Sequence, residues 1–211
     1  MREVLDGQSD DRLVGKPYFD DFEKYFWDIG QPGFWKLERL QTFQEPRSES
    51  WLAYARGDWE ESLRLHEARR PSIVEYYRKI ADHGFQTRRV RVVEKPLTPY
   101  LQWEFQLLRI RDQLGGKVRV VSAEQVARFE TDGPLPEINV LGAEVMYRLC
   151  YDENGSQEGG IRFTDPDLIA HWRKFIQDLY SVGEDLEEFF QREVATLEPP
   201  RRVADASRSA S

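Results

Sequence analysis

A carboxylate and a guanidinium lie seven residues apart in PYLQWEFQLLRIRDQL, at residues 99–114. In a helix, this segment has two apolar stripes, one of Tyr100, Trp103, Leu107, Ile110 and Leu114 and the other of Leu101, Phe105 and Leu108. Glu104 and Arg111 then fall between the two stripes. Ionisable groups on an apolar face cost several kcal/mol unless they are paired or used. The pair therefore predicts either a ligand-binding or catalytic role, or a structural salt bridge to Arg89, Arg91 or Arg119.

The loop before this helix is a second place where a ligand is expected. The segment RVRVVEKPLTPY at residues 89–100 reads as a strand that ends near Glu94, followed by a short turn. In open α/β sheets, ligands bind beyond the carboxyl ends of parallel strands. Glu94, Arg91, Tyr100 and Trp103 are therefore candidates for binding. The alternative for the two aromatic residues is that they belong to the core.

Aromatic and charged residues also alternate in FWKLERLQTF, at residues 34–43. Trp35, Lys36 and Arg39 suit a partner interface or an anion site. The alternative is a helix that packs on the sheet through Phe34, Leu37 and Leu40. The complete set of binding candidates is Trp35, Lys36, Arg39, Arg91, Glu94, Tyr100, Trp103, Glu104 and Arg111, with Glu104 as the best catalytic candidate.

Several kinds of chemistry have no motif in this sequence. Neither GxGxxG nor a P-loop follows either VRVV segment, and HExxH, paired CxxC and GxSxG are absent. The single Cys150 and three widely spaced histidines offer no metal-ligand spacing. We therefore expect neither a cofactor nor a metal ion.

Composition narrows the class of protein. The net charge of −8 over 211 residues argues against direct nucleic-acid binding, which needs a positive surface. No segment approaches the ~20 apolar residues of a membrane span, and the first residues lack the apolar core of a signal peptide. The sequence therefore predicts a cytoplasmic protein that does not contact the membrane.

The elements that must position the candidate residues indicate a mixed α/β fold. VRVV occurs at residues 90–93 and 118–121, separated by enough residues for a crossover helix, which predicts a βαβ unit with parallel strands. The segments EVMYRLCYD and IRF, joined by ENGSQEGG, predict a β-hairpin, with a bulge expected near Gly159 and Gly160. We expect one mixed sheet covered by helices, and a last long helix that opens at Asp165-Pro166.

The expected organisation is a single domain at residues 16–198, with a helical part at 16–84 and a sheet part at 85–198. Residues 1–15 are expected to form a flexible N-terminal tail. Residues 199–211 are small and polar, and are expected to form a disordered C-terminal tail.

Six segments together resemble an uncharacterised actinobacterial family, classified as a domain of unknown function. They are FWKLERLQTFQEP, GDWEESLRL, RVRVVEKPLTPYLQWE, GPLPE, GGIRFTDPDLIAHW and LYSVGEDLEEFF, and the resemblance covers residues 26–200. The resemblance implies that the gene lies beside helix-turn-helix regulators or among biosynthetic genes. It implies no catalytic residues.

Two functions remain open. The first is a non-catalytic regulatory or sensing protein whose partner is a helix-turn-helix regulator or a small ligand. The second is a small enzyme of specialised metabolism, without metal or nucleotide, that uses Glu104 in acid–base chemistry. An open pocket at Glu104 favours the enzyme, and a filled interior with Glu104 in a salt bridge favours the regulatory protein.

Overall fold

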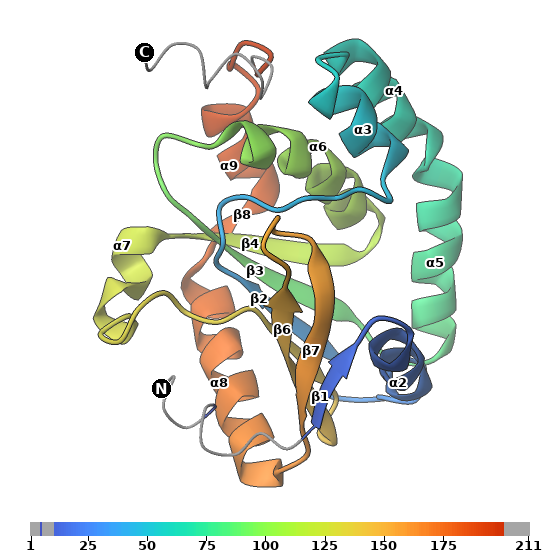
Figure 1. Ribbon diagram of the computed structural model, residues 1–211, viewed down its shortest axis with the longest axis vertical. Coiled ribbons are helices and arrows are strands. Elements are labelled where there is room, and N and C mark those ends of the chain that lie inside the picture. The colour runs from blue at the N-terminus through green and yellow to red at the C-terminus, as the bar shows by residue number, and fades with distance from the viewer. Residues whose placement is uncertain (1–4, 6–10, 201–211) are drawn as a thin grey trace.

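The computed structural model describes residue 5 and residues 11–200. It contains an eight-stranded sheet in the order β1-β7-β6-β5-β2-β3-β4-β8 (Figure 1). The strands are β1 Asp11–Val14, β2 Phe34–Glu38, β3 Thr87–Val93, β4 Gly116–Ser122, β5 Ile138–Leu141, β6 Val145–Tyr151, β7 Gln157–Phe163 and β8 Glu184–Asp185. The helices are α2 Lys16–Phe26, α3 Glu49–Ala55, α4 Trp59–Ala68, α5 Arg70–Asp82, α6 Pro99–Leu114, α7 Ala123–Val126, α8 Pro166–Val182 and α9 Leu186–Glu193. The expected mixed α+β fold is confirmed.

The predicted βαβ unit is confirmed. β3 and β4 are parallel, and α6 connects them. The hydroxyl of Thr98 accepts a hydrogen bond from the backbone N–H of Leu101 at 3.2 Å, which caps the start of α6. Gly115 ends the helix with a φ of 126°, in a region that L side chains rarely adopt. Local turn chemistry thus sets both ends of the helix that carries Glu104 and Arg111.

The predicted hairpin is confirmed as β6 paired with β7, and its irregularity lies beside the first of the two glycines, as expected. Cys150 pairs with Gly159 whereas Tyr151 pairs with Gln157, which leaves Glu158 without a partner on β6. The glycines also allow close packing. A Cβ at Gly159 would lie 2.0 Å from the carbonyl oxygen of Leu13, and one at Gly160 would lie 2.9 Å from the ring of Tyr18. Glycine therefore allows β1 and α2 to approach the hairpin.

Two expectations for the N-terminal part were wrong. Residues 34–38, expected to begin a helix, form β2, which lies between β5 and β3 in the middle of the sheet. Residues 11–14, expected to belong to the N-terminal tail, form β1 and pair with β7. Because β2 completes the sheet, the boundary between a helical part at 16–84 and a sheet part at 85–198 does not hold. Most of the C-terminal segment at 199–211 lies outside the described residues.

The two faces of the sheet differ in chemistry. On one face, α8 packs through Trp172, Ile176 and Leu179 against an apolar surface that includes Trp35 of β2. On the other face, one cluster lies beneath α6 and α9 and another beneath α2 and α5. Charged side chains of β2 and β3 lie on this second face. Figure 1 shows α3, α4 and α5 following one another along the side of the molecule away from α8.

Candidate functional site

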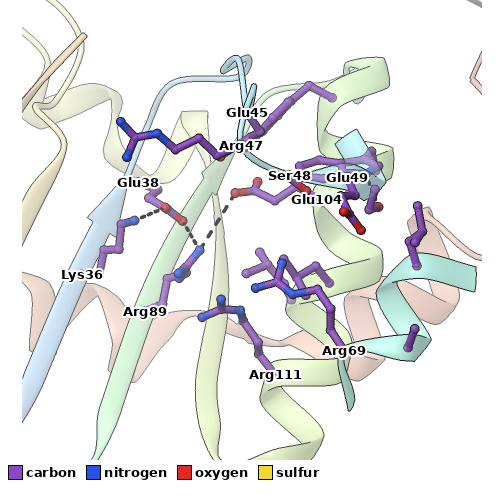
Figure 2. A pocket seen from close by; sticks show the side chains of 17 residues that line it. Lys36, Glu38, Glu45, Arg47, Ser48, Glu49, Arg69, Arg89, Glu104 and Arg111 are labelled. Carbon is purple, nitrogen blue, oxygen red and sulfur yellow. Dashed lines mark hydrogen bonds and ion pairs between the residues drawn. The ribbon is translucent and has the colours of Figure 1, made fainter. Parts of the chain in front are cut away.

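A pocket of about 770 Å³ lies over these charged side chains. Its floor comes from β2 and β3, one wall from α6, and the opposite rim from residues 45–50 and from the end of α4 (Figure 2). The lining residues are Lys36, Glu38, Glu45, Arg47, Ser48, Glu49, Ser50, Leu65, Ala68, Arg69, Arg89, Tyr100, Trp103, Glu104, Leu107, Leu108 and Arg111. A volume of this size is in the range of about 300–1,000 Å³ that small-molecule sites occupy.

The floor of the pocket is a chain of alternating charges. Lys36 Nζ lies 2.6 Å from Glu38 Oε1, and Arg89 Nη1 lies 2.7 Å from Glu38 Oε2. Arg89 Nη1 is also 4.0 Å from Glu104 Oε1. The other carboxylate oxygen of Glu104, Oε2, accepts a hydrogen bond from Arg91 Nε at 2.8 Å. Figure 2 shows the interactions from Lys36 to Glu104 as dashed lines. This series of alternating charges therefore connects the neighbouring strands β2 and β3 to α6.

Strand periodicity explains why these charges meet. Alternate residues of a strand point to the same face, so Lys36 and Glu38 share a face, as do Arg89 and Arg91. The parallel register then pairs Lys36 with Arg89 and Glu38 with Arg91. Arg89 therefore reaches Glu38 on the adjacent strand and Arg91 reaches Glu104 on α6, whereas Lys36 pairs with Glu38 of its own strand.

The buried carboxylate of Glu38 keeps its charge. Burial alone would raise its pKa, but the cations Arg89, Lys36 and Arg91 more than offset burial and lower the pKa to about 2. Arg91 is fully buried, and Glu104 and Glu38 raise its pKa against the opposing effect of burial. Glu38 and Arg91 are therefore both ionised throughout the physiological pH range.

The predicted environment of Glu104 is confirmed. The residue is 5% exposed and forms its ion pair with Arg91, from the sheet, as expected. Its neighbours on α6 hold the rim of the pocket. Trp103 Nε1 donates to Ser50 Oγ at 3.0 Å, and the hydroxyl of Tyr100 lies 3.3 Å from Glu45 Oε1. These two contacts attach residues 45–50 to the helix wall.

Arg69 and Arg111 line the helical side of the pocket, from the junction of α4 with α5 and from α6 (Figure 2). Within residues 11–200, neither guanidinium forms an ion pair or a side-chain hydrogen bond. The pKa of Arg69 is lowered, first because burial removes water from the group and second because Arg111 carries a like charge. Neither guanidinium thus has an ion pair with a carboxylate of the described chain, although the charge of Glu45 opposes the lowering of the Arg69 pKa. Arg47 is a further lining cation without an ion pair and lies over the ring of Phe19 at 5.3 Å.

Glu45 carries the opposite charge in the same pocket. Its carboxylate accepts a hydrogen bond from the hydroxyl of Tyr100 at 3.3 Å, and it forms no ion pair with a described residue. Burial raises its pKa; the charge of Lys36 opposes this shift, whereas Glu104 adds to it. Glu45 is thus an acceptor without a cation of its own.

The nine candidate residues do not form one site. Lys36, Tyr100, Trp103, Glu104 and Arg111 line the pocket. Arg91 lies beneath it, in contact with Glu104. Trp35 points to the other face of the sheet, where its ring lies 5.5 Å from that of Tyr180.

Arg39 and Glu94 lie at the ends of β2 and β3, outside the pocket lining. Arg39 forms ion pairs with Glu94 at 2.7 Å and with Glu130 at 2.6 Å, and its backbone N–H donates to Glu137 at 2.6 Å. These contacts attach the segment after α7 to the sheet. Of the site expected beyond the carboxyl ends of the parallel strands, Tyr100 and Trp103 line the pocket, which lies over the face of the sheet, whereas Glu94 does not.

Sequence reasoning missed the charged pocket residues Glu38, Glu45, Arg69 and Arg89. Arg69 lies at a helix junction and Glu45 in a loop, and neither position has a periodic pattern to mark it. Glu38 and Arg89 had a usable pattern, because KLE and RVR alternate charge with an apolar residue, as a half-polar strand does. That pattern would have placed both side chains on one face.

Fold and site together define an α+β protein with a charged pocket on one face of a mixed sheet. Residues 20–191 match the family model described as a domain of unknown function (DUF6879). The chain belongs to this family. A comparison with curated proteins found no match.

Two further properties concern the described residues. No group of three or more His, Cys, Asp or Glu side chains within them is arranged to hold a metal ion. In the same part of the chain, no helix has the length and apolar character needed to cross a membrane.

Proposed function

We propose that this protein is a non-catalytic sensing protein that binds a small charged molecule in the pocket over β2 and β3. The observation that carries the proposal is the pair Arg69 and Arg111, which line a pocket of ligand size without a carboxylate partner. Arg69 is exposed and Arg111 is half-buried, so a ligand that enters the pocket can reach both guanidiniums. An anionic group of a ligand supplies the missing partner.

The contacts of Glu104 support binding over catalysis. One of its oxygens accepts a hydrogen bond from Arg91 at 2.8 Å and the other lies 4.0 Å from Arg89. A general acid or base must exchange a proton with its substrate. Both of its oxygens thus face guanidiniums, a geometry that suits a structural carboxylate that holds the floor of the pocket together.

The alternative is an enzyme that uses Glu104 in acid–base chemistry. One observation favours it, because Glu104 lines an open pocket and does not lie in a filled interior. Glu104→Gln discriminates between the two functions. It should lower stability and leave ligand binding measurable in a sensing protein, whereas in an enzyme it should reduce turnover by about 10²–10⁴ with little effect on affinity.

The wider setting of the proposal follows the resemblance. We propose that the protein acts in the cytoplasm of an actinobacterium, with a helix-turn-helix regulator as the partner that receives the signal, or in specialised metabolism. A pull-down from a native host tests this setting. Recovery of a helix-turn-helix protein, released when ligand is added, is the expected result.

Co-purified small molecules test the binding function. The protein is purified from a native host, denatured, and the released small molecules are identified by mass spectrometry. Wild type is compared with Arg111→Gln and with the matched control Arg78→Gln, which removes an exposed guanidinium from α5. We expect one molecule with an anionic group in the extracts of wild type and control, and we expect it to be absent from the extract of Arg111→Gln. Identical extracts from all three proteins overturn the proposal.

A further inference from the structure

The unpaired charges of the pocket have both signs. Among the described residues, the lining cations Arg47, Arg69 and Arg111 and the lining carboxylates Glu45 and Glu49 form no ion pair, and Arg47 instead lies over the ring of Phe19 at 5.3 Å. Arg69, Arg111 and Glu45 face the same cavity without an ion pair between them, although the charge of Glu45 opposes the lowering of the Arg69 pKa. A ligand that fits between them can contact both.

The positive end suits a carboxylate or phosphate. A guanidinium presents its donors in a planar fork that matches the two oxygens of such a group. Arg111 comes from α6 and Arg69 from the end of α4, so the two approach from different elements (Figure 2). The two positive charges repel each other, and an anion bound between them would offset this repulsion.

The negative end suits an ammonium group. Glu45 lies within the electrostatic influence of two other carboxylates, Glu104 and Glu38, which disfavour its charge. Lys36 is the nearest compensating cation, but its Nζ is 2.6 Å from Glu38, which holds it. A purely anionic ligand would add to this repulsion, whereas an ammonium group removes it.

The overall charge of the lining agrees with this reading. The cations are Lys36, Arg47, Arg69, Arg89 and Arg111, and the carboxylates are Glu38, Glu45, Glu49 and Glu104, so five positive groups face four negative ones. A pocket for a polyanion would show a clear excess of positive charge. Trp103, Leu107 and Leu108 add an apolar stretch of wall on α6.

We propose that the ligand is a zwitterion of the amino-acid class, whose anionic group binds Arg69 and Arg111 and whose ammonium group binds Glu45. The proposal rests on the binding function and names the chemistry of the molecule sensed. The hydrocarbon between the two charged groups lies along the apolar wall of α6.

Calorimetric titration with simple probes tests the assignment. The probes are glycine, β-alanine and their longer ω-amino acid homologues, each compared with the dicarboxylate and the diamine that have the same number of methylenes. We expect one ω-amino acid to bind wild type at least about tenfold more tightly than its matched dicarboxylate and diamine, a difference of about 1.4 kcal/mol. The control Arg78→Gln should keep this preference.

Single substitutions test the negative and the positive end of the pocket one at a time. Glu45→Gln should remove the preference over the dicarboxylate, and Arg111→Gln should remove the preference over the diamine. Arg69→Gln is the second variant for the positive end, and far-UV circular dichroism establishes that each variant is folded.

Three results overturn the assignment. A dicarboxylate or inorganic phosphate that binds wild type more tightly than every ω-amino acid rejects the zwitterion, while the binding function stands. The zwitterion is also rejected, and the binding function stands, if a molecule co-purifies with wild type but not with Arg111→Gln while no ω-amino acid binds in the titrations. If nothing in the series binds and nothing co-purifies, both proposals fail.

Discussion

At the scale of single residues, the ion pair of Glu104 with Arg91 offsets the free-energy cost of burying a guanidinium inside the protein. Arg91 is on a central strand with no exposed surface, and one of its guanidinium nitrogens, Nη2, has no hydrogen-bond partner. Nε donates to Glu104 at 2.8 Å, and Nη1 lies 3.3 Å from the carbonyl oxygen of Val92. Glu104 is therefore the close counter-ion on which the burial of Arg91 depends.

Glu104→Ala should lower the free energy of unfolding by roughly 3–5 kcal/mol, because it leaves the Arg91 guanidinium buried without its carboxylate. Urea denaturation followed by circular dichroism measures the change. The control Glu75→Ala removes a carboxylate from an exposed pair with Arg78 and should change stability by less than about 1 kcal/mol. Equal effects of the two substitutions would contradict the role assigned to the buried pair.

Glu137 is the residue whose titration should make stability depend on pH near neutrality. Burial, and next the charge of Glu38, raise its pKa to about 7, although Arg91 opposes the shift. Its Oε1 accepts from the backbone N–H groups of Arg39 and Leu40, but its Oε2 has no partner. Between the ordinary carboxyl pKa of 4.5 and about 7, the folded protein thus binds more protons at this site than the unfolded chain.

The stability of wild type relative to Glu137→Gln should therefore fall as pH rises from about 4.5 to about 7, by up to roughly 3 kcal/mol, and then stay level. Denaturation of both proteins across this range gives the difference, in which the titration of other groups cancels. Glu38 titrates below the window, because its pKa is about 2. A difference that is constant from pH 4.5 to 7 would show that Glu137 has an ordinary pKa.

At the scale of elements, the sequence predicted those segments whose ends are marked by local chemistry. The βαβ unit carries Thr98 and Gly115 at the ends of its helix, and the hairpin carries a glycine-rich turn, so both were found. β2 was missed because Phe34, Leu37 and Leu40 recur at helical spacing. Its extended form depends on pairing with β3 and β5, which lie far away in the sequence.

Gly159 tests how β1 joins the sheet. Gly159→Ala should destabilise the protein by about 1–3 kcal/mol, because the added Cβ would meet the backbone of β1 at 2.0 Å. Hydrogen exchange should show lost protection in residues 11–14, with little change in β3 and β4. Gln157→Ala, at an exposed position of the same strand, is the matched control. Unchanged protection of β1 in the variant would mean that the strand adjusts without loss of pairing.

At the scale of the whole molecule, the pocket exists because segments far apart in the sequence converge over one face of the sheet. Glu104 and Arg111 were found from helical phase alone, since both are on one helix. Arg69 and Glu45 reach the same cavity through the packing of α4 and of the loop before α3, which no local pattern encodes. Spacing within an element predicts which residues share a face, but it does not predict what lies opposite them.

The unpaired arginines should make the ligand-free protein less stable than it need be, as is common where a site is shaped for binding. Arg69→Gln should therefore raise the free energy of unfolding of ligand-free protein by a few tenths of a kcal/mol, because it removes the repulsion from Arg111. Added salt screens that repulsion, so the gain should shrink as ionic strength rises. The control Arg64→Gln, on the same helix, breaks an ion pair with Glu61 at 2.6 Å and should have the opposite sign. A loss of stability in Arg69→Gln at low salt would show that Arg69 stabilises the fold, which would contradict its assignment as an unpaired group that binds an anion.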